Sequence, residues 1–221
     1  MCHCDIPKLS AVLFIKFALK ITGRMEIVFA SNNLHKIKEI NNVLGDSFKL
    51  LSLSDIKMEE DIPEDEPTLE GNALHKALFI HNATGMNVFA DDTGLETEAL
   101  NGEPGVHSAR FAGSGKDSEA NIDKLLSLIG NNTNRNARFR TVIALILEGK
   151  EYLFEGIVNG KIISERRGRM GFGYDPVFVP DGGKLTFAEM DLDAKNLISH
   201  RARAFAKLKS FLISQSRAPE R

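Results

Sequence analysis

The segment from Met25 to Gly45 constrains the fold most, because a strand pattern passes directly into a helix pattern across a short polar turn. Met25–Ala30 is mostly apolar and is typical of a buried strand. The polar residues Ser31–Asn33 follow, and Leu34–Leu44 then carries apolar residues on one helical face, with Gly45 where a helix commonly ends. Such a turn presents free backbone N–H groups at the start of a helix. We therefore expect an α/β fold with an anion-binding site at this turn.

The rest of the chain continues this alternation and then becomes rich in strands. Helical spacing predicts helices over Thr68–Ala83, over Ser118–Ile129 with Ser118 as its N-cap and Gly130 closing it, and over Ser199–Ile213. Apolar and β-branched runs predict strands over Val88–Ala90, Arg138–Leu147, Glu151–Val158 and Pro176–Val179, with turns at Glu148–Lys150 and at the hairpin signal Asn159-Gly160. The pattern as a whole predicts a mixed α/β fold.

Size and composition indicate a single globular domain, which we expect over residues 25–215. The 221 residues suit one domain, and 43% hydrophobic with 26% charged residues excludes a disordered or collagen-like chain. A net charge of −2 provides no basic field for holding nucleic acid. A small nucleotide site needs only a few local cations, so nucleotide binding stays open while a nucleic-acid partner is not expected.

The first 24 residues differ in character from the rest of the chain. Their apolar run is too short for a membrane span and contains a charge, and Thr22–Arg24 makes a poor signal-peptide cleavage site. The two cysteines both lie here, too few for a disulfide framework and without a second pair of metal ligands. We interpret residues 1–24 as an extension without a role, with Met25 as the natural start, and residues 216–221 as a frayed tail. We expect a cytoplasmic protein without membrane contact.

Carboxylates that directly follow the strand Val88–Ala90 are the first candidates for chemistry. Asp91 and Asp92 lie where α/β proteins usually bind ligands, and a turn beginning at Asp92 would free one of them to point into a cleft. Mg²⁺ takes carboxylate oxygens together with substrate phosphates, and the acidic stretch Glu59–Glu66 could supply a second ligand. The alternative is a plain polar turn at Asp91–Gly94 beside a solvated acidic loop.

Two further segments combine residues suited to a nucleotide. Gly168–Pro176 places glycines around two aromatic residues; glycines let the backbone approach a ligand, and an aromatic ring stacks on a base. Arg201 lies in the first turn of a helix, where negative charge is favoured, so we expect it to bind an anion or a carbonyl oxygen. Core packing of the aromatics and a solvated arginine are the alternatives. Neither Gly168–Pro176 nor Gly113–Lys116 has the spacing of a dinucleotide or P-loop motif.

Six segments, in this order, resemble the inosine triphosphate pyrophosphatase family, the dITP/XTP pyrophosphatases. They are Ala30–Lys36, Thr68–Ala77, Ala90–Leu95, Pro104–Phe111, Gly171–Phe178 and Lys195–Arg201. The resemblance spans Met25–Leu212 and implies a mixed α/β fold with an elongated central β-sheet flanked by helices and a cleft between two lobes. It also implies hydrolysis of ITP, dITP and XTP between the α and β phosphates, with Mg²⁺ as cofactor and a homodimer as the usual assembly.

The resemblance further implies roles for individual residues. Asp92 would be the catalytic general base and, with Glu64, a metal ligand; Glu66 is the alternative, because the family's Glu-Thr-Gly pattern reads Glu64-Asp65-Glu66 here. The implied phosphate-binding residues are Ser31, Asn32, Asn33, Leu34, His35, Lys36 and Lys76. Thr93 would contact the substrate, and the implied residues around the base are Phe172, Gly173, Tyr174, Asp175, Lys195, His200 and Arg201.

The mechanism that we expect is direct attack of a water molecule on the α phosphorus, with Asp92 taking the proton and the lysines stabilising the developing charge. Donors from His200 or Arg201 to O6, with Asp175 accepting from N1–H, would favour hypoxanthine and xanthine. Adenine would leave buried groups unpaired in such a site.

Two other functions are weighed against this one. A related pyrophosphatase of the Maf type would act on modified or pyrimidine nucleotides, whereas Ser199–Arg201 favours a purine. The second alternative is a catalytically silent nucleotide-binding module. The presence of Asp92, Lys36 and the acidic loop argues against it. Pyrophosphate release from a panel of triphosphates, with and without Mg²⁺, separates the three.

Overall fold

The structure is a computed structural model and describes residues 25–33, 36–37, 40, 48–58, 60 and 62–216. The expectations for residues 1–24, for Leu34 and His35, for the helix end at Gly45 and for residues 217–221 lie outside these ranges. Among residues 34–44, the described Lys36, Ile37 and Ile40 are helical, in agreement with the sequence pattern.

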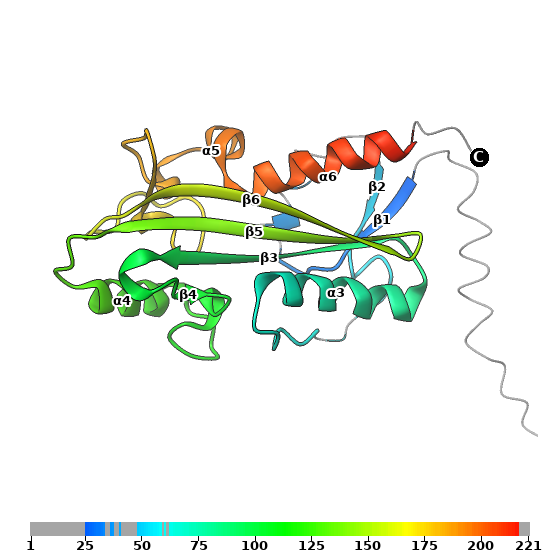
Figure 1. The fold of residues 1–221 in the computed structure, drawn as a ribbon, viewed down its shortest axis with the longest axis horizontal. Coiled ribbons are helices and arrows are strands. Elements are labelled where there is room, and N and C mark those ends of the chain that lie inside the picture. The colour runs from blue at the N-terminus through cyan, green and yellow to red at the C-terminus, as the bar shows by residue number, and fades with distance from the viewer. Residues whose placement is uncertain are drawn as a thin grey trace, which may run out of the picture.

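A mixed seven-stranded sheet runs the length of the molecule (Figure 1). Its strands are β1 (Met25–Phe29), β2 (Phe48–Leu51), β3 (Val88–Thr97), β4 (Pro104–Gly105), β5 (Asn136–Leu147), β6 (Lys150–Ile162) and β7 (Phe178–Pro180). The order is β2-β1-β3-β5-β6-β7, with β4 paired to β3. Strand β1 is parallel to β2 and β3, and the other pairs are antiparallel, so the sheet combines an α/β unit with the predicted meander.

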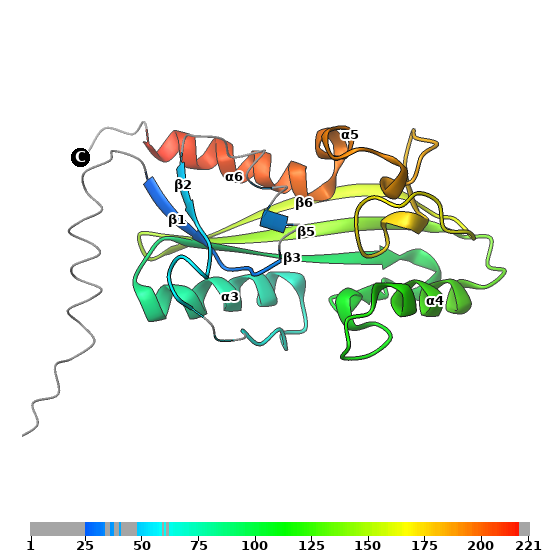
Figure 2. The ribbon, with the colours of Figure 1, turned by 180° about the vertical axis from the view of Figure 1, so that it is seen from behind.

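Helices cover both faces of the sheet, as Figures 1 and 2 show from opposite sides. Helices α3 (Leu69–Thr84) and α4 (Ser118–Ile129) lie on one face, and α5 (Leu192–Ile198) and α6 (His200–Ser216) lie on the other. Thr68 caps α3 by accepting a hydrogen bond from Gly71 N at 3.0 Å, and Gly85 ends the helix in the left-handed region, as the sequence pattern predicts. None of the described helices is both long and apolar enough to cross a membrane.

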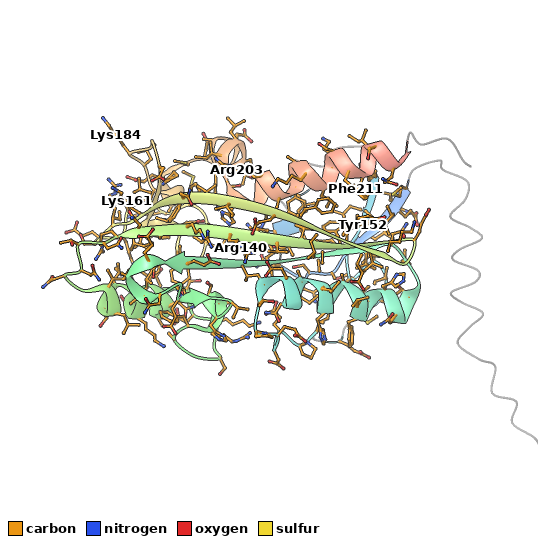
Figure 3. All side chains as sticks on the ribbon, in the orientation of Figure 1. Arg140, Tyr152, Lys161, Lys184, Arg203 and Phe211 are labelled. Atoms are coloured by element: carbon orange, nitrogen blue, oxygen red, sulfur yellow. The ribbon has the colours of Figure 1, made fainter. Side chains whose placement is uncertain are left out.

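Alternation along the strands divides the core between the two helical layers. Ile27, Phe29 and Phe89 pack with α6 residues, while Val28 and Ala90 belong to the cluster that α3 covers. Aromatic contacts reinforce the α6 side, where Tyr152 of β6 and Phe211 of α6 lie with ring centroids 4.5 Å apart (Figure 3). A third cluster forms under α4, where Ile122, Leu125 and Ile129 are buried as predicted.

Two predicted turns are wrong because long-range pairing extends both strands through them. Strand β3 continues past Asp91 and Asp92, which pair with Ile143 and Val142 of β5, so no turn begins at Asp92. Strand β6 likewise runs through Asn159-Gly160 rather than turning there. A Cβ on Gly160 would lie 2.6 Å from the Phe178 ring, so this glycine serves close packing.

Three smaller predictions also need correction. The N-cap of α4 is Asp117, whose carboxylate accepts from Glu119 N at 2.9 Å and from Ala120 N at 3.2 Å, and Ser118 is the first helical residue. Pro176 lies in the 3-10 turn Asp175–Val177, and the strand follows it at Phe178–Pro180. Ser216, expected in the tail, ends α6, and the seven-residue helix α5 was not predicted.

Candidate active site

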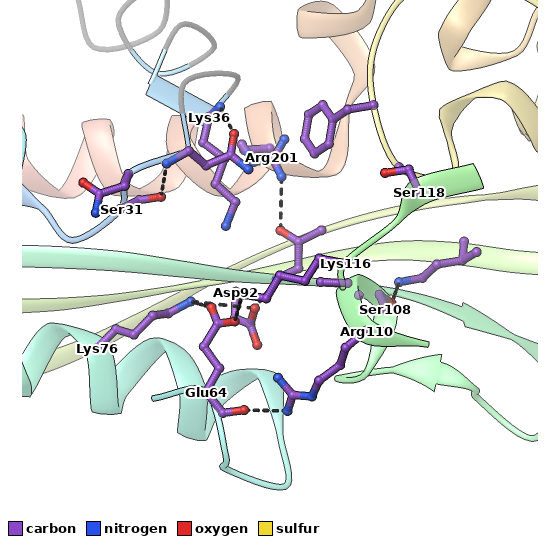
Figure 4. Close-up of a pocket in the computed structure, with 18 of the residues that line it drawn as sticks. Ser31, Lys36, Glu64, Lys76, Asp92, Ser108, Arg110, Lys116, Ser118 and Arg201 are labelled. Carbon is purple, nitrogen blue, oxygen red and sulfur yellow. Dashed lines mark hydrogen bonds and ion pairs between the residues drawn. The ribbon is translucent and has the colours of Figure 1, made fainter. Parts of the chain in front are cut away.

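A cavity of about 510 Å³, which is large enough for a small-molecule ligand, opens beside the middle of β3 (Figure 4). It is lined by the residues that follow β1, by β3, by parts of α3 and α4, by the 3-10 turn Ser108–Arg110, and by α5 and the start of α6. The predicted site residues that line it are Ser31, Asn32, Asn33, Lys36, Glu64, Lys76, Asp92, Thr93, Phe172, Gly173, Tyr174, Asp175, Lys195, His200 and Arg201.

Glu64 and Asp92 meet around the ammonium group of Lys76 (Figure 4). Lys76 Nζ lies 2.7 Å from Glu64 Oε1 and 3.8 Å from Asp92 Oδ1, and the lysine is 6% exposed. One helical turn earlier, Asn72 Nδ2 donates to Asp92 Oδ2 at 3.0 Å. Asn72 and Lys76, which are i, i+4 neighbours on α3, therefore hold the Asp92 carboxylate from two sides.

The protein environment moves the pKa values of these two carboxyl groups in opposite directions. Burial raises the pKa of Asp92, and the opposing effects of Lys76, Lys36 and the Asn72 hydrogen bond do not cancel the rise. Burial also acts to raise the pKa of Glu64, but Lys76, through its charge and its hydrogen bond, holds this pKa below the usual value. The pKa of Lys76 is raised, because Asp92 and Glu64 outweigh the effect of burial. The environment thus favours the ionised form of Glu64, whereas it makes Asp92 a better proton acceptor than an aspartate in water.

Asp91 points to the opposite face of β3 and anchors two cations. Its carboxylate lies 2.9 Å from Lys36 Nζ and 3.6 Å from Arg201 Nε, and its side chain is fully buried. Burial acts to raise the pKa of Asp91, yet Lys36 and Arg201 hold it below the usual value. Thr93 lies two residues further along the same face. Its hydroxyl forms a hydrogen bond with the Thr141 hydroxyl at 2.7 Å and accepts another from Arg201 Nη2 at 3.4 Å.

The glycine-rich segment after β6 folds over a buried ion pair. Lys195 Nζ donates to Asp175 Oδ2 at 2.8 Å, and the same oxygen accepts from Phe172 N at 2.8 Å. Gly171 has a φ of 78°, a conformation that favours glycine, and a Cβ there would collide with the Asp175 carboxylate. The Phe172 ring lies 5.1 Å from Lys195 Nζ and 5.3 Å from Arg201 Cζ. An aromatic face and two cations therefore meet on one wall of the cavity.

The side chains of His200 and Tyr174 also line the cavity. His200 is buried and stacks on Phe139 with centroids 4.6 Å apart, and burial together with Arg201 and Lys195 keeps its pKa well below 6.5. The imidazole is therefore neutral at neutral pH. Tyr174 is also buried, and its hydroxyl donates to Ser108 O at 2.9 Å, so it ties the glycine-rich segment to the 3-10 turn across the cavity.

The Ham1 family model matches residues 27–211. This chain belongs to the Ham1 family. It is 53% identical over 184 residues to the dITP/XTP pyrophosphatase of Flavobacterium johnsoniae, covering 83% of this chain and 96% of the relative. The dITP/XTP pyrophosphatase of Porphyromonas gingivalis is 52% identical over 189 residues, covering 85% and 97%. The structure of the Staphylococcus aureus Ham1 protein matches with a TM-score of 0.80 and 41% identity, covering 86% of this chain and 99% of that one. The family predicted from the six segments is confirmed.

The cavity contains two carboxylates that could hold a divalent cation. Glu64 and Asp92 both contact Lys76, so their oxygens converge in the cavity, whereas Glu66 lies near His75 at 3.7 Å and is not among the described cavity-lining residues. Within the described residues, no group of three or more His, Cys, Asp or Glu side chains is placed to hold a metal. Two carboxylates fit Mg²⁺, which usually completes its octahedral shell with water and substrate phosphates.

The structure of this Ham1 family member also brings in residues that sequence reasoning did not assign. Arg110 Nη2 donates to the Glu64 carbonyl oxygen, and Lys116 Nζ lies 3.7 Å from Glu64 Oε2 (Figure 4). Arg110 lies in one of the six segments that resemble the family, although the resemblance implied no role for it. Asp91 was singled out as a carboxylate, but only the pairing of β3 reveals that it faces Lys36.

Proposed function

We propose that this protein hydrolyses dITP, ITP and XTP to the nucleoside monophosphates and pyrophosphate, and so removes them from the nucleotide pool. The observation that carries the proposal is one cavity in which Glu64 and Asp92 flank Lys76, and in which Phe172 lies beside Lys195 and Arg201. The first group suits a metal-bound triphosphate, and the second suits a purine base. The relatives described above carry the corresponding name, which supports the same activity here.

The chemistry assigned to Asp92 follows from its surroundings. We propose that Glu64 and Asp92 would hold Mg²⁺, which would supply positive charge for the phosphates and for the departing pyrophosphate. Asp92, with its raised pKa, orients a water molecule and accepts its proton as the water attacks the α phosphorus. Lys36 and Lys76 stabilise the charge that develops on the phosphate oxygens. No covalent intermediate is needed.

Selection of the base rests on the hydrogen-bond donors that surround the Phe172 ring. Lys195, His200 and Arg201 can each donate a hydrogen bond, which suits the O6 acceptor of hypoxanthine and xanthine. Adenine has an amino group at that position, so it would set a donor against these donors and gain no hydrogen bond from them. Asp175 Oδ2 already accepts from Lys195 and from Phe172 N, so its clearest contribution is to orient that ammonium group and that ring.

Pyrophosphate release from ITP, dITP, XTP, GTP, ATP and dTTP, measured with Mg²⁺ and with EDTA, tests the proposal. We expect kcat/KM for the first three to exceed that for ATP by up to about 10⁴-fold, because a mismatched base forfeits its hydrogen bonds to the buried groups of the site. Turnover should be lost in EDTA. A preference for dTTP would instead indicate a Maf-type enzyme, and binding without turnover of any triphosphate would indicate a silent nucleotide-binding module.

Assembly and location complete the proposal. We propose a homodimer on the resemblance to the inosine triphosphate pyrophosphatase family, and light scattering coupled to size-exclusion chromatography checks it; a mass of about 24.4 kDa would indicate a monomer and contradict it. We place the activity in the cytoplasm, where free nucleotides are the substrate, and fractionation of cells from the native source tests this placement.

A further inference from the structure

The buried carboxylate of Asp91 has no role in the chemistry proposed for Asp92, although the two residues are neighbours. Its side chain has no exposed surface, and an ionised carboxylate at such a position is costly unless it is paired. The partners are Lys36 Nζ at 2.9 Å and Arg201 Nε at 3.6 Å, with Thr93 Oγ1 donating at 3.4 Å. Both cations line the cavity, whereas Asp91 itself is not among the residues that do.

Lys36 and Arg201 come from distant parts of the chain. Lys36 follows the polar turn after β1, and Arg201 lies in the first turn of α6, so 165 positions separate them in the sequence. They also serve different parts of a nucleotide in the proposed site, since Lys36 faces the phosphates and Arg201 lies over the Phe172 ring. Asp91 is the group that both cations share.

We propose that Asp91 is a positioning residue, which holds Lys36 and Arg201 in place and so joins the phosphate-binding and base-binding parts of the site. The inference rests on the proposed function for the identity of the ligand. Strand geometry makes the arrangement possible, because successive residues of β3 point to opposite faces. Asp92 is thereby presented to Lys76 and Asn72 under α3, and Asp91 to Lys36 and Arg201 on the α6 side.

The alternative is that Asp91 only neutralises buried charge and stabilises the fold. That alternative predicts a loss of stability in Asp91 variants, without any particular pattern in ligand affinity. A positioning role predicts a pattern: affinity for pyrophosphate should depend on Asp91 only when Lys36 is present. Affinity for inosine 5′-monophosphate should depend on Asp91 through Arg201 whether or not Lys36 is present.

The test measures dissociation constants of pyrophosphate and of inosine 5′-monophosphate by calorimetry, in EDTA, for wild type, Asp91→Asn, Lys36→Met and the double variant. We expect Asp91→Asn to raise the dissociation constant of each ligand by about 10- to 100-fold, the change expected when one charge-assisted contact to the ligand is lost. In the Lys36→Met background, we expect Asp91→Asn to leave pyrophosphate affinity unchanged and still to weaken the monophosphate. The proposal would be overturned if Asp91→Asn weakened pyrophosphate binding equally in the wild-type and Lys36→Met backgrounds. It would also be overturned if Asp91→Asn changed the affinity for neither ligand.

Controls separate folding and function from positioning. Thermal melts establish that each variant is folded, and Asp123→Asn repeats the substitution at an exposed ion pair with Arg166, where we expect no change in either affinity. If Asp91→Asn alone does not fold, the double variant is used instead, because it removes the two opposite charges together. The test is then the comparison of its affinity for inosine 5′-monophosphate with that of Lys36→Met. Wild-type turnover of ITP is measured in parallel with Mg²⁺: its absence refutes the proposed function, whereas normal turnover with unchanged Asp91→Asn affinities refutes only this inference.

Discussion

Gly156 on β6 lies directly against the first turn of α6, and replacing it with alanine should displace the residues that this turn contributes to the site. A Cβ at position 156 would lie 2.5 Å from Ala204 N and still closer to the carbonyl oxygen of His200. Both atoms belong to the helix backbone and cannot rotate away. The start of α6, with His200 and Arg201, must therefore move away from the sheet.

The size of the movement follows from the contact distance. Bringing Ala204 N from 2.5 Å to the 3.4 Å of ordinary contact requires a shift of at least about 0.9 Å, and the closer contact with the His200 carbonyl oxygen requires a larger one. Overpacking of this kind costs about 1–3 kcal/mol, and each kcal/mol lowers Tm by roughly 2–4 °C in a chain of this size. A displacement of about 1 Å at a binding residue costs up to roughly 100-fold in rate. We therefore expect a lower Tm together with a 10- to 100-fold lower kcat/KM for ITP.

The assay compares Tm and kcat/KM for wild type and Gly156→Ala, with Gly115→Ala as the matched control. A Cβ at position 115 would meet nothing within 4 Å, and the φ of Gly115 is not positive, so both parameters should stay at wild-type values there. A folded Gly156→Ala protein with unchanged kcat/KM would refute the reasoning that the start of α6 sets the geometry of the base-binding wall.

Two further variants test individual groups. Asp92→Asn should lower kcat by at least about 10²-fold, the usual contribution of a general base, while ITP binding is retained; near-normal kcat would show that another group accepts the proton. His200→Gln tests the buried neutral imidazole, whose pKa is lower when folded than the 6.5 of the unfolded chain. As pH falls below 6.5, the unfolded chain takes up a proton that the folded protein does not. The wild-type free energy of unfolding should therefore fall with a slope up to about 1.4 kcal/mol per pH unit steeper than that of His200→Gln, and equal slopes in denaturant titrations would contradict this.

Much of the fold could be predicted because the signals are local. The strand Met25–Phe29, the helix Leu69–Thr84 with its Thr68 cap, and the turn at Glu148–Lys150 follow from apolar periodicity, capping and turn chemistry. The helix over Ser118–Ile129 was also predicted, although its cap is Asp117. Each of these features depends on residues within a few positions of one another.

The residues of the site were predictable as a set, but their geometry was not. The segments that resemble the family contain many of the described cavity-lining residues, including Lys76, Asp92 and Arg201, whereas others such as Lys116 and Phe139 lie outside them. They did not reveal that Glu64 and Asp92 share Lys76, or that Arg110 holds the Glu64 carbonyl oxygen. Such contacts join positions far apart in the sequence, and no local pattern encodes them.

The sequence by itself determined the family, the α/β class and the kinds of side chain that the site contains. The tertiary structure decided which face each carboxylate occupies. Pairing with β5 keeps Asp91 and Asp92 in one continuous strand, so that the first meets Lys36 and the second meets Lys76. The turn expected at Asp92 was locally plausible, because Asp-Asp-Thr-Gly is polar. The extended strand forms instead, because β5 pairs with all ten residues of β3 and supplies their backbone hydrogen bonds. Such a partner strand comes from elsewhere in the chain and is not visible in the local sequence.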